Sequence, residues 1–352
     1  MDSPDRDSSG LYSGASGVGR APERTVVNAT PELAVFRRHG GRISAAEALF
    51  PHAPRPWLDL STGINPRPYP APTLGRRHLT RLPDPEALAD LEAVAAVAFG
   101  APPDRVAATP GTEAALRLLP HLLGARSVAI AEPTYSGHRE AWRAAGVEIL
   151  PKGLRAEVQV VVNPNNPDGR LTPAATLIAA ARTGWVVVDE AFADPHPDAS
   201  VAAHAGQRLV VLRSFGKFYG LPGLRLGFVV AEPSLAARVR AAFGEWPVST
   251  PAILAGRAAY ADEIWRARMR RTLSRDGKRL DALLERAGLT VVGGTDLFRL
   301  ARAPEAEAVF LRLATAGVLC RAFDRSDLLR FGLPGPRADW DRLAAALQKG
   351  RP

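Results

Sequence analysis

Three polar residues that could bind and react with a phosphorylated carbonyl compound lie in one segment: Ser214, Lys217 and Arg225. The segment also carries glycines and a proline, and the apolar runs at 209–212 and 227–230 on either side are typical of buried strands. A lysine amine can form a Schiff base, while a hydroxyl and a guanidinium can hold a phosphate. Most lysines are solvated surface residues, so Lys217 needs support from the rest of the chain.

That support comes from polar residues placed just after other apolar runs. The residues are Tyr135, Asn166, Asp189 and Lys217, which follow runs at 128–131, 158–162, 185–188 and 209–212. In open α/β sheets a ligand binds at the carboxyl ends of the strands. The shared placement therefore indicates one binding site at one edge of a sheet.

The elements that must position these residues alternate between short apolar strands and helices, which indicates an α/β fold with a mostly parallel sheet covered on both faces. After Pro251 the pattern changes to that of a smaller α+β domain. Helices are expected at 44–49, 85–99, from 109–113 onward, 138–145, 173–182, 252–273, 275–287, 304–316 and 340–347, and later strands at 290–292, 297–300, 318–322 and 328–331. The prolines between residues 66 and 72 exclude regular structure there.

We divide the chain into four parts on composition and pattern. Residues 1–30 are rich in Ser, Gly, Asp and Pro and are expected to be a disordered tail. Residues 31–75 form a segment that joins the small domain and the site. Residues 76–250 form the large domain that binds the cofactor, and residues 251–352 form the small C-terminal domain.

Composition narrows the class of protein. The 352 residues include one cysteine, Cys320, so no disulfide framework is possible and a cytoplasmic location fits. No apolar run approaches the roughly 20 residues of a membrane helix. The net charge of +9 comes from arginines spread along the chain without interleaved aromatic residues, which disfavours nucleic acid as a partner and fits an anionic small substrate.

These residues supply the parts that a pyridoxal 5'-phosphate site needs. Lys217 could hold the aldehyde, Asp189 could keep the pyridine nitrogen protonated, Asn166 could donate to the ring oxygen, and Tyr135 could stack on the ring. The expected cradle for the phosphate consists of Gly111, Thr112, Glu113, Ser214 and Arg225. Each residue also has an ordinary structural role, such as a helix cap or a turn, and their order along the chain is what favours the site.

At these motifs the sequence resembles the fold-type I pyridoxal-phosphate enzymes, the aspartate aminotransferase superfamily. The motifs are the Asn-Pro-Asn-Asn-Pro run at 163–167 with Gly169, the Asp-Glu-Ala run at 189–191, and Ser214 with Lys217 and Arg225. The histidinol-phosphate aminotransferase branch is similar overall. The His-Gly-Gly run at 39–41 and the segment 59–66 resemble the threonine-phosphate decarboxylases of cobalamin biosynthesis.

The resemblance implies a homodimer that acts on a small phosphorylated amino acid. It implies that Arg330 grips the substrate carboxylate with its bidentate fork. It further implies that Arg321, His39, Gly40 and Gly63 contact the substrate, chiefly its phosphate, and that Asn166 also reaches the substrate.

Two departures from the family pattern bear on the reaction. Related aminotransferases carry a tyrosine where this chain has Phe192, which leaves Asn166 as the main donor to the ring oxygen and is similar to the decarboxylase branch. Many relatives also have an Arg-Tyr-Pro segment whose tyrosine reaches the neighbouring subunit's cofactor. Here Leu82 stands between Arg81 and Pro83, so that contact is not carried over.

Two other functions remain open on the residues alone. One is an aminotransferase on a phosphorylated amino acid such as histidinol phosphate, because the same residues serve loss of CO2 and transfer of the amine. The other is a non-catalytic DNA-binding protein on this fold. It is disfavoured because the polar tail is too short for a helix-turn-helix domain.

Overall fold

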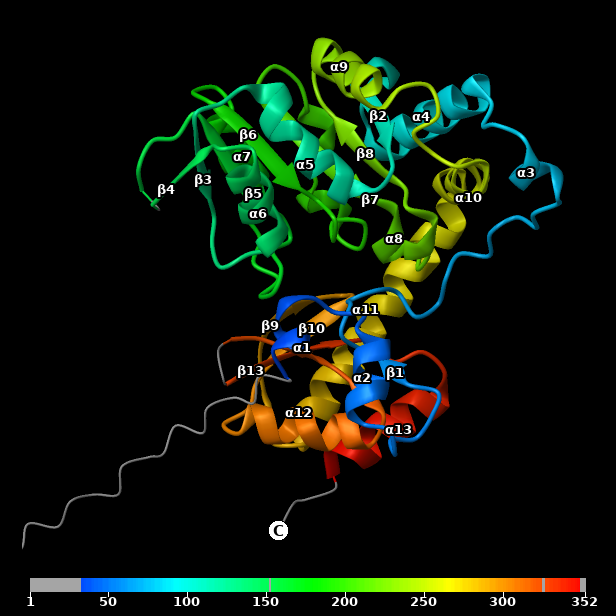
Figure 1. Cartoon of the computed structure of the whole chain (residues 1–352), viewed down its shortest axis with the longest axis vertical. Helices are drawn as coiled ribbons and strands as arrows, with labels where there is room; N and C mark the ends of the chain where they lie inside the picture. Colours follow the sequence, from blue (N-terminus) through cyan, green and yellow to red (C-terminus); the bar gives the residue numbers. More distant parts are fainter. Residues whose placement is uncertain (1–32, 152, 325–326, 349–352) are drawn as a thin grey trace, which may run out of the picture.

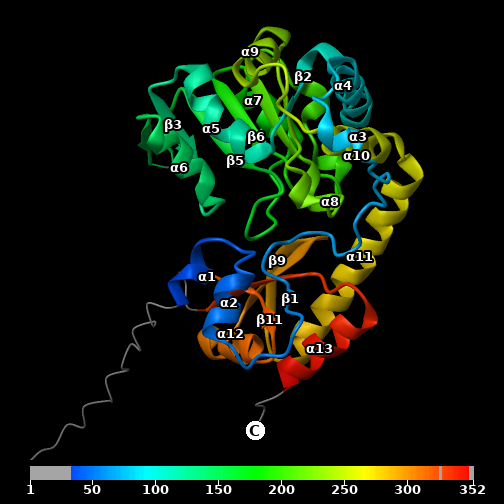
Figure 2. The same ribbon diagram turned by 45° about the vertical axis from the view of Figure 1, so that its right-hand side comes forward.

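The computed structural model describes residues 33–151, 153–324 and 327–348. The predicted disordered tail, residues 1–30, lies outside these residues. Figure 1 shows two groups of elements, one above the other, and Figure 2 shows the long helix α11 (Glu263–Arg286) running between them. Among the described residues, no helix combines the length and the apolar composition that crossing a membrane requires.

The upper group, the large domain, is built on a seven-stranded sheet of order β2-β8-β7-β6-β5-β3-β4. Only β8 runs antiparallel to its neighbours in this sheet, so the prediction of a mostly parallel sheet is confirmed. The strands are β2 (Val106–Thr109), β3 (Ser127–Ile130), β4 (Glu148–Leu150), β5 (Val158–Val162), β6 (Trp185–Asp189), β7 (Leu209–Ser214) and β8 (Gly227–Val230).

Helices cover both faces of this sheet because its strands are apolar on both sides. Val187 packs with α5, α6 and α9, whereas its neighbours Val186 and Val188 belong to the core that α4, α7 and α10 complete. The helices are α4 (Pro85–Phe99), α5 (Thr112–Leu123), α6 (Ser136–Ala144), α7 (Ala174–Ala180), α8 (Phe215–Phe218), α9 (Pro233–Phe243) and α10 (Thr250–Ala261). The predicted helix 85–99 is confirmed: Asp84 caps its start, and Gly100 ends it with φ at +68°.

The lower group, the small domain, holds a four-stranded antiparallel sheet of order β12-β13-β10-β9 and a two-stranded parallel sheet of β1 and β11. The strands are β1 (Leu58–Asp59), β9 (Thr290–Thr295), β10 (Phe298–Arg302), β11 (Val318–Leu319), β12 (Arg321–Ala322) and β13 (Leu328–Gly332). The helices are α1 (Ala34–Arg38), α2 (Ile43–Leu49), α12 (Ala306–Thr315) and α13 (Arg337–Gln348). The smaller α+β domain is thus confirmed, while the residue boundaries of the four predicted parts stay predictions.

Two predicted elements were wrong in detail. The break between the long helices lies at Asp262 and not near residue 274, because the Asp262 carboxylate accepts the backbone N–H of Trp265 and starts α11 there. The strand expected at 318–322 is two strands that join different sheets, with β11 on β1 and β12 on β13. This change of sheet pairs Arg321 directly with Arg330 in the antiparallel register.

Several short elements were not predicted from the sequence. They are β2, β4, α1, α3 (Arg77–Thr80), α9 and the 3₁₀ turns Pro103–Arg105, Pro197–Ala199, Ala202–His204 and Pro222–Leu224. Most span too few residues to show a period, and α9 is a run of alanines and arginines with few large apolar residues.

Close backbone contacts fix the position of the two domains relative to each other at the site. Gly294 donates its N–H to the Asp168 carbonyl at 2.9 Å, and a Cβ on Gly169 would lie only 1.9 Å from the Gly294 carbonyl oxygen. Gly169 has φ at +71°, so a side chain is excluded both by space and by conformation. On the other side, the Asn65 N–H donates to the Lys217 carbonyl at 2.9 Å. The N-terminal segment is thereby hydrogen-bonded to the segment that carries Lys217.

A buried ion cluster ties β7 to the turn that follows β6. Arg213 donates to Glu190 at 2.7 Å and to Asp194 at 2.6 Å, and all three side chains are nearly inaccessible to water. Glu190 also accepts from Ser200 Oγ and the Val201 N–H. The two carboxylates depend on this one guanidinium, so its removal leaves buried charge without compensation.

We predict that Arg213→Met lowers the free energy of unfolding by about 3 to 5 kcal/mol, because Glu190 and Asp194 then lose their buried cation. Urea unfolding followed by circular dichroism measures the change. Arg126→Met is the matched control, since Arg126 is almost fully exposed beside Glu157 and its loss should leave the midpoint close to wild type. Equal midpoints for the two variants would contradict the prediction.

Candidate active site

A cavity of about 760 Å³ lies between the two domains. Its walls come from both domains: Asp189 ends β6 and Lys217 follows β7 of the large sheet, whereas Arg321 and Arg330 lie on the small sheet. All but one of the residues predicted for the site line it. They are His39, Gly40, Gly111, Thr112, Glu113, Tyr135, Asn166, Asp189, Ser214, Lys217, Arg225, Arg321 and Arg330.

The exception is Gly63, which does not line the cavity. It is buried with φ at +65°, and a Cβ there would lie 3.1 Å from the Phe298 ring and 3.4 Å from the Phe192 ring. Phe192 itself lines the cavity, with its ring packed on that of Phe298 at 5.0 Å between centroids. Gly63 therefore supports the cavity wall from behind.

Lys217 lies on the short helix α8, with its amine in the cavity 5.8 Å from the centre of the Phe192 ring. Burial, followed by the positive charge of Arg330, lowers the pKa of the Lys217 amine to about 8, although the Asp189 carboxylate opposes the shift. A larger fraction of this amine is neutral near pH 8 than for an ordinary lysine. A neutral amine is what attack on an aldehyde and acceptance of a proton require.

An anion cradle forms where α5 begins. Gly111 has φ at +86°, and a Cβ on it would lie 2.8 Å from the Arg225 guanidinium, so only glycine lets Arg225 approach the helix start. Arg225 also has a left-handed backbone, with φ at +54°, a conformation that costs energy and often marks functional sites. Thr112 and Ser214 line the same part of the cavity, so the N–H groups at the helix start, the Ser214 hydroxyl and the Arg225 charge lie together. The Thr112 hydroxyl donates to the Arg213 carbonyl at 3.2 Å.

The Asp189 carboxylate is held from two sides. The Ala191 N–H donates to Oδ1 at 3.0 Å, and His138 Nε2 lies 2.8 Å from Oδ2, with His138 itself buried. A carboxylate can only accept, so Nε2 is the nitrogen that carries the hydrogen in this pair. The sequence reasoning missed His138, which it read only as the start of a helix. The His-x-x-x-Trp pattern on α6 gave no reason to pair it with a strand end 51 residues away.

Tyr135 lies at the start of α6, and its hydroxyl donates to Glu113 Oε2 at 3.0 Å. Burial and the Glu113 carboxylate raise the pKa of Tyr135 well above its ordinary value, so the hydroxyl stays protonated at neutral pH. Glu113 in turn pairs with Arg117 at 2.7 Å. The structure thus uses Glu113 to orient the tyrosine ring in the cavity wall.

The three asparagines of the run at 163–167 do different work. Asn163 and Asn165 are buried and hold the loop, through Thr172 and through Thr134 with Asp168 respectively. Only Asn166 lines the cavity, where its amide oxygen accepts a hydrogen bond from Arg330. The amide nitrogen, with its two hydrogens, is the end left for a ligand.

Arg330 is buried, with an exposed fraction of 5%, and its guanidinium lies 4.9 Å from the centre of the Phe298 ring. It donates to Asn166 and, at 2.8 Å, to the Ser61 carbonyl. Burial and the nearby charge of Arg321 lower the pKa of Arg330 to about 9. This charge lacks a carboxylate partner among the described residues, so an anion bound in the cavity would stabilise it.

Arg321 and the residues before α2 form the far end of the cavity. Arg321 donates to the carbonyls of Phe36, at 2.7 Å, and of Arg38, the last residue of α1. Burial lowers the pKa of Arg321 to about 10, with Asp324 opposing the shift. Burial, then the charge of Arg321, lowers the pKa of His39 below its ordinary value, so the ring is neutral at pH 7.

Sequence reasoning also missed other residues of the cavity wall. Besides His138, which lies behind the wall, they include Arg37, Arg38, Thr62, Glu140 and Asp324. The pair of arginines directly before His39 was a signal that could have been used, since their charge suits a phosphate. Glu140 gave none, because a glutamate on an amphipathic helix is ordinarily solvated.

Comparison with known proteins shows the family to which this chain belongs. A family model described as aminotransferase class I and II matches residues 71–347. A threonine-phosphate decarboxylase from a Sinorhizobium species is 43% identical over 326 residues, which cover 88% of this chain and 97% of that protein. A threonine-phosphate decarboxylase from Pseudomonas aeruginosa is 39% identical over 323 residues, which cover 88% of this chain and 96% of that protein.

A solved structure shows the same fold. Histidinol-phosphate aminotransferase from Sinorhizobium meliloti, in complex with pyridoxal-5'-phosphate, has a TM-score of 0.77 at 21% identity, covering 92% of this chain and 97% of that one. The fold-type I architecture predicted from the motifs is thereby confirmed. On the family model and on relatives that it matches almost end to end, the chain belongs to the aminotransferase class I and II family, in which the threonine-phosphate decarboxylases are its relatives.

Proposed function

We propose that this chain uses pyridoxal 5'-phosphate to decarboxylate O-phospho-L-threonine, giving (R)-1-aminopropan-2-ol phosphate and CO2 for cobalamin biosynthesis. The observation that carries the proposal is a row of cations along one cavity. Lys217, Arg225, Arg321 and Arg330 all line it. The charges of Arg330 and Arg225 lower the pKa of Lys217, and the charge of Arg321 lowers the pKa of Arg330. Such a row suits a cofactor phosphate, a carboxylate and a substrate phosphate in turn.

The residues present fit the cofactor. Gly111 leaves room for Arg225 beside the start of α5, so the cradle presents donors at a single point, as a phosphate requires. Asp189, held in place by His138 and the Ala191 N–H, would face the pyridine nitrogen, and Tyr135 would cover one face of the ring. When bound, pyridoxal phosphate supplies a ring that accepts electrons from the substrate's α-carbon.

The chain's own residues then divide the work of the reaction. Arg330 would hold the substrate carboxylate, and Asn166 Nδ2 would donate one hydrogen to the cofactor ring oxygen. Lys217, with its pKa near 8, can hold a proton and donate it to the α-carbon, where it replaces the CO2 that has left. Phe192 is buried against Phe298 and offers no hydroxyl to the ring oxygen.

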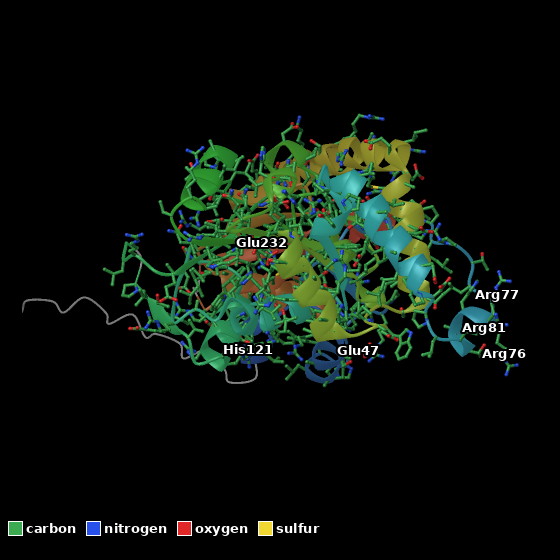
Figure 3. All side chains as sticks on the ribbon, turned by 90° about the horizontal axis from the view of Figure 1, so that it is seen from above. Glu47, Arg76, Arg77, Arg81, His121 and Glu232 are labelled. Carbon is green, nitrogen blue, oxygen red and sulfur yellow. The ribbon has the colours of Figure 1, made fainter. Side chains whose placement is uncertain are left out.

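Further parts of the proposal concern assembly and location. We propose a homodimer, supported by the segment around α3, which Figure 3 shows at the edge of the molecule with Arg76, Arg77 and Arg81 labelled. In this segment Leu79 and Leu82 have exposed fractions of 71% and 69%, which is costly unless a second copy covers them. We also propose that the protein acts in the cytoplasm, supported by its single cysteine, and that nucleic acid is not a partner.

The first test is product analysis with the purified protein loaded with cofactor. O-Phospho-L-threonine should release CO2 and yield a phosphorylated amine, with no 2-oxo acid formed. Lys217→Ala should lower this rate at least about a thousandfold, since it removes both the covalent attachment and the proton carrier. Turnover that occurs only when 2-oxoglutarate is added would instead establish an aminotransferase.

A second test locates the attachment of the cofactor. Borohydride treatment should fix pyridoxal phosphate to the wild-type chain, and mass spectrometry of its peptides should find the label on Lys217. Lys217→Ala should lose the label, while Lys278→Ala, which removes an exposed lysine of α11, should keep it. A label of unchanged yield in Lys217→Ala would place the site elsewhere.

A third test uses the protein without cofactor and follows stability against pH. Burial lowers the pKa of Lys217 from 10.5 in the unfolded chain to about 8 in the folded one. Below pH 8 both states are protonated, so Lys217→Met should be more stable than wild type by about 3 kcal/mol. As pH rises from 8 to 10.5, the unfolded state binds more protons, wild type gains stability and the gap closes.

Urea unfolding at pH values between 7 and 10.5 measures this gap, and Lys278→Met serves as the control with no pH-dependent difference. A gap of constant size across this range would show that Lys217 has the pKa of a solvated lysine.

A further inference from the structure

The proposed substrate carries a phosphate of nearly two negative charges at neutral pH, because the second pKa of a phosphate monoester is about 6. The residues that the family resemblance assigns to this phosphate are Arg321, His39, Gly40 and Gly63, of which only Arg321 and His39 have side chains that can carry positive charge. Arg321 brings one charge, which Asp324 partly offsets, and His39 is neutral at pH 7. A second cation is therefore needed at this end of the cavity.

The cavity wall contains six lysines and arginines, and elimination leaves one for this task. The six are Arg37, Arg38, Lys217, Arg225, Arg321 and Arg330. Lys217, Arg225 and Arg330 are taken up by the cofactor and the carboxylate under the proposed function. Arg37 is hydrogen-bonded to Glu307 at 3.1 Å on the small domain, where its side chain is mostly covered. Arg38 remains.

Arg38 is held loosely. Its guanidinium lies 3.3 Å from Glu140 Oε2, a contact that is an ion pair without the geometry of a hydrogen bond, and its side chain keeps 67% of its surface exposed. The backbone beneath it is fixed, because Arg321 donates to the Arg38 carbonyl. The side chain can therefore swing while its attachment point stays at the cavity rim.

Glu140 keeps a second positively charged neighbour when Arg38 moves away. It lies on α6 of the large domain and also faces Arg117 Nη2 at 3.8 Å, and Arg117 is in turn held by Glu113. The Arg38–Glu140 pair thus bridges the two domains at the rim. A phosphate entering here would repel Glu140 and attract Arg38.

We propose that Arg38 is a ligand of the substrate phosphate. Without phosphate Arg38 pairs with Glu140, and a bound phosphate displaces that carboxylate. This inference rests on the proposed function for the identity of the substrate. It makes Arg38 and Glu140 a pair with opposite effects on affinity: one binds the phosphate and the other competes with it.

The opposite signs give a sharp test in the protein loaded with cofactor. Isothermal titration calorimetry with inorganic phosphate as the probe should show binding weakened about tenfold or more in Arg38→Met and strengthened severalfold in Glu140→Gln. The KM for O-phospho-L-threonine should follow the same signs, with kcat changed less than KM. The affinity for L-threonine, which lacks the phosphate, should be equal in Arg38→Met and wild type.

Arg42→Met is the matched control. It removes the same charge four residues along, from an exposed arginine that does not line the cavity, and should leave the phosphate affinity within about twofold of wild type. Melting temperatures of the two arginine variants should match wild type, since the side chain of Arg38 is 67% exposed and Arg42 is exposed as well.

Two results would overturn the proposal. Equal phosphate affinities in Arg38→Met and Arg42→Met would show a general effect of charge, and weaker binding in Glu140→Gln would show that the ion pair is only a structural latch. Failure of the proposed function has a different signature: no CO2 is released from O-phospho-L-threonine, yet the calorimetry with phosphate still reports on Arg38.

Discussion

Crowding of positive charge in one partly buried cavity is the constraint on which the rest of the structure depends. Lys217, Arg321 and Arg330 all have lowered pKa values, with burial as the first cause, and neighbouring cations lower those of Lys217 and Arg330 further. Such an arrangement opposes folding by itself, and anionic ligands relieve it. The ligand-free protein therefore has a lower free energy of unfolding than it would without this repulsion, and binding of a cofactor and a substrate with phosphate groups offsets the loss.

The scaffold must hold these cations together against their repulsion. The fold does so with neutral backbone groups: Lys217 is clasped through its carbonyl by Asn65, Arg330 donates to Ser61, and Arg321 donates to the end of α1. Carbonyl oxygens thereby orient the two arginine side chains without neutralising them, whereas at Lys217 the bond holds the main chain. Carboxylates would hold them more strongly but would compete with the ligand, as Glu140 does for Arg38.

The sequence predicted most strands of the large sheet, and that the polar residues after them gather in one cavity, because both follow from patterns within short windows. Apolar runs of four or five residues located β5 and β7, and the polar residue after each strand had to fall at the same sheet edge. His138 and Glu140 were beyond reach because their partners lie far away in sequence. Arg38 was missed although the arginine pair before His39 offered a signal. The break at Asp262 was missed because the apolar pattern runs on through a capped break. Gly63 does not line the cavity although Ser61 and Thr62 before it do, so its predicted contact with the substrate stays a prediction.

Arg321 shows why the two ends of the cavity cannot be understood separately. It pairs in register with Arg330, so one short strand sets the distance between the groups proposed to hold the substrate's phosphate and its carboxylate. A guanidinium has five N–H donors, and the two given to the carbonyls of Phe36 and Arg38 leave three for a ligand. The same side chain can therefore fix α1, and with it the backbone of Arg38, and still bind an anion. Specificity for a phosphorylated amino acid then depends on the change of sheet between β11 and β12, because a single continuous strand would leave Arg321 without this pairing.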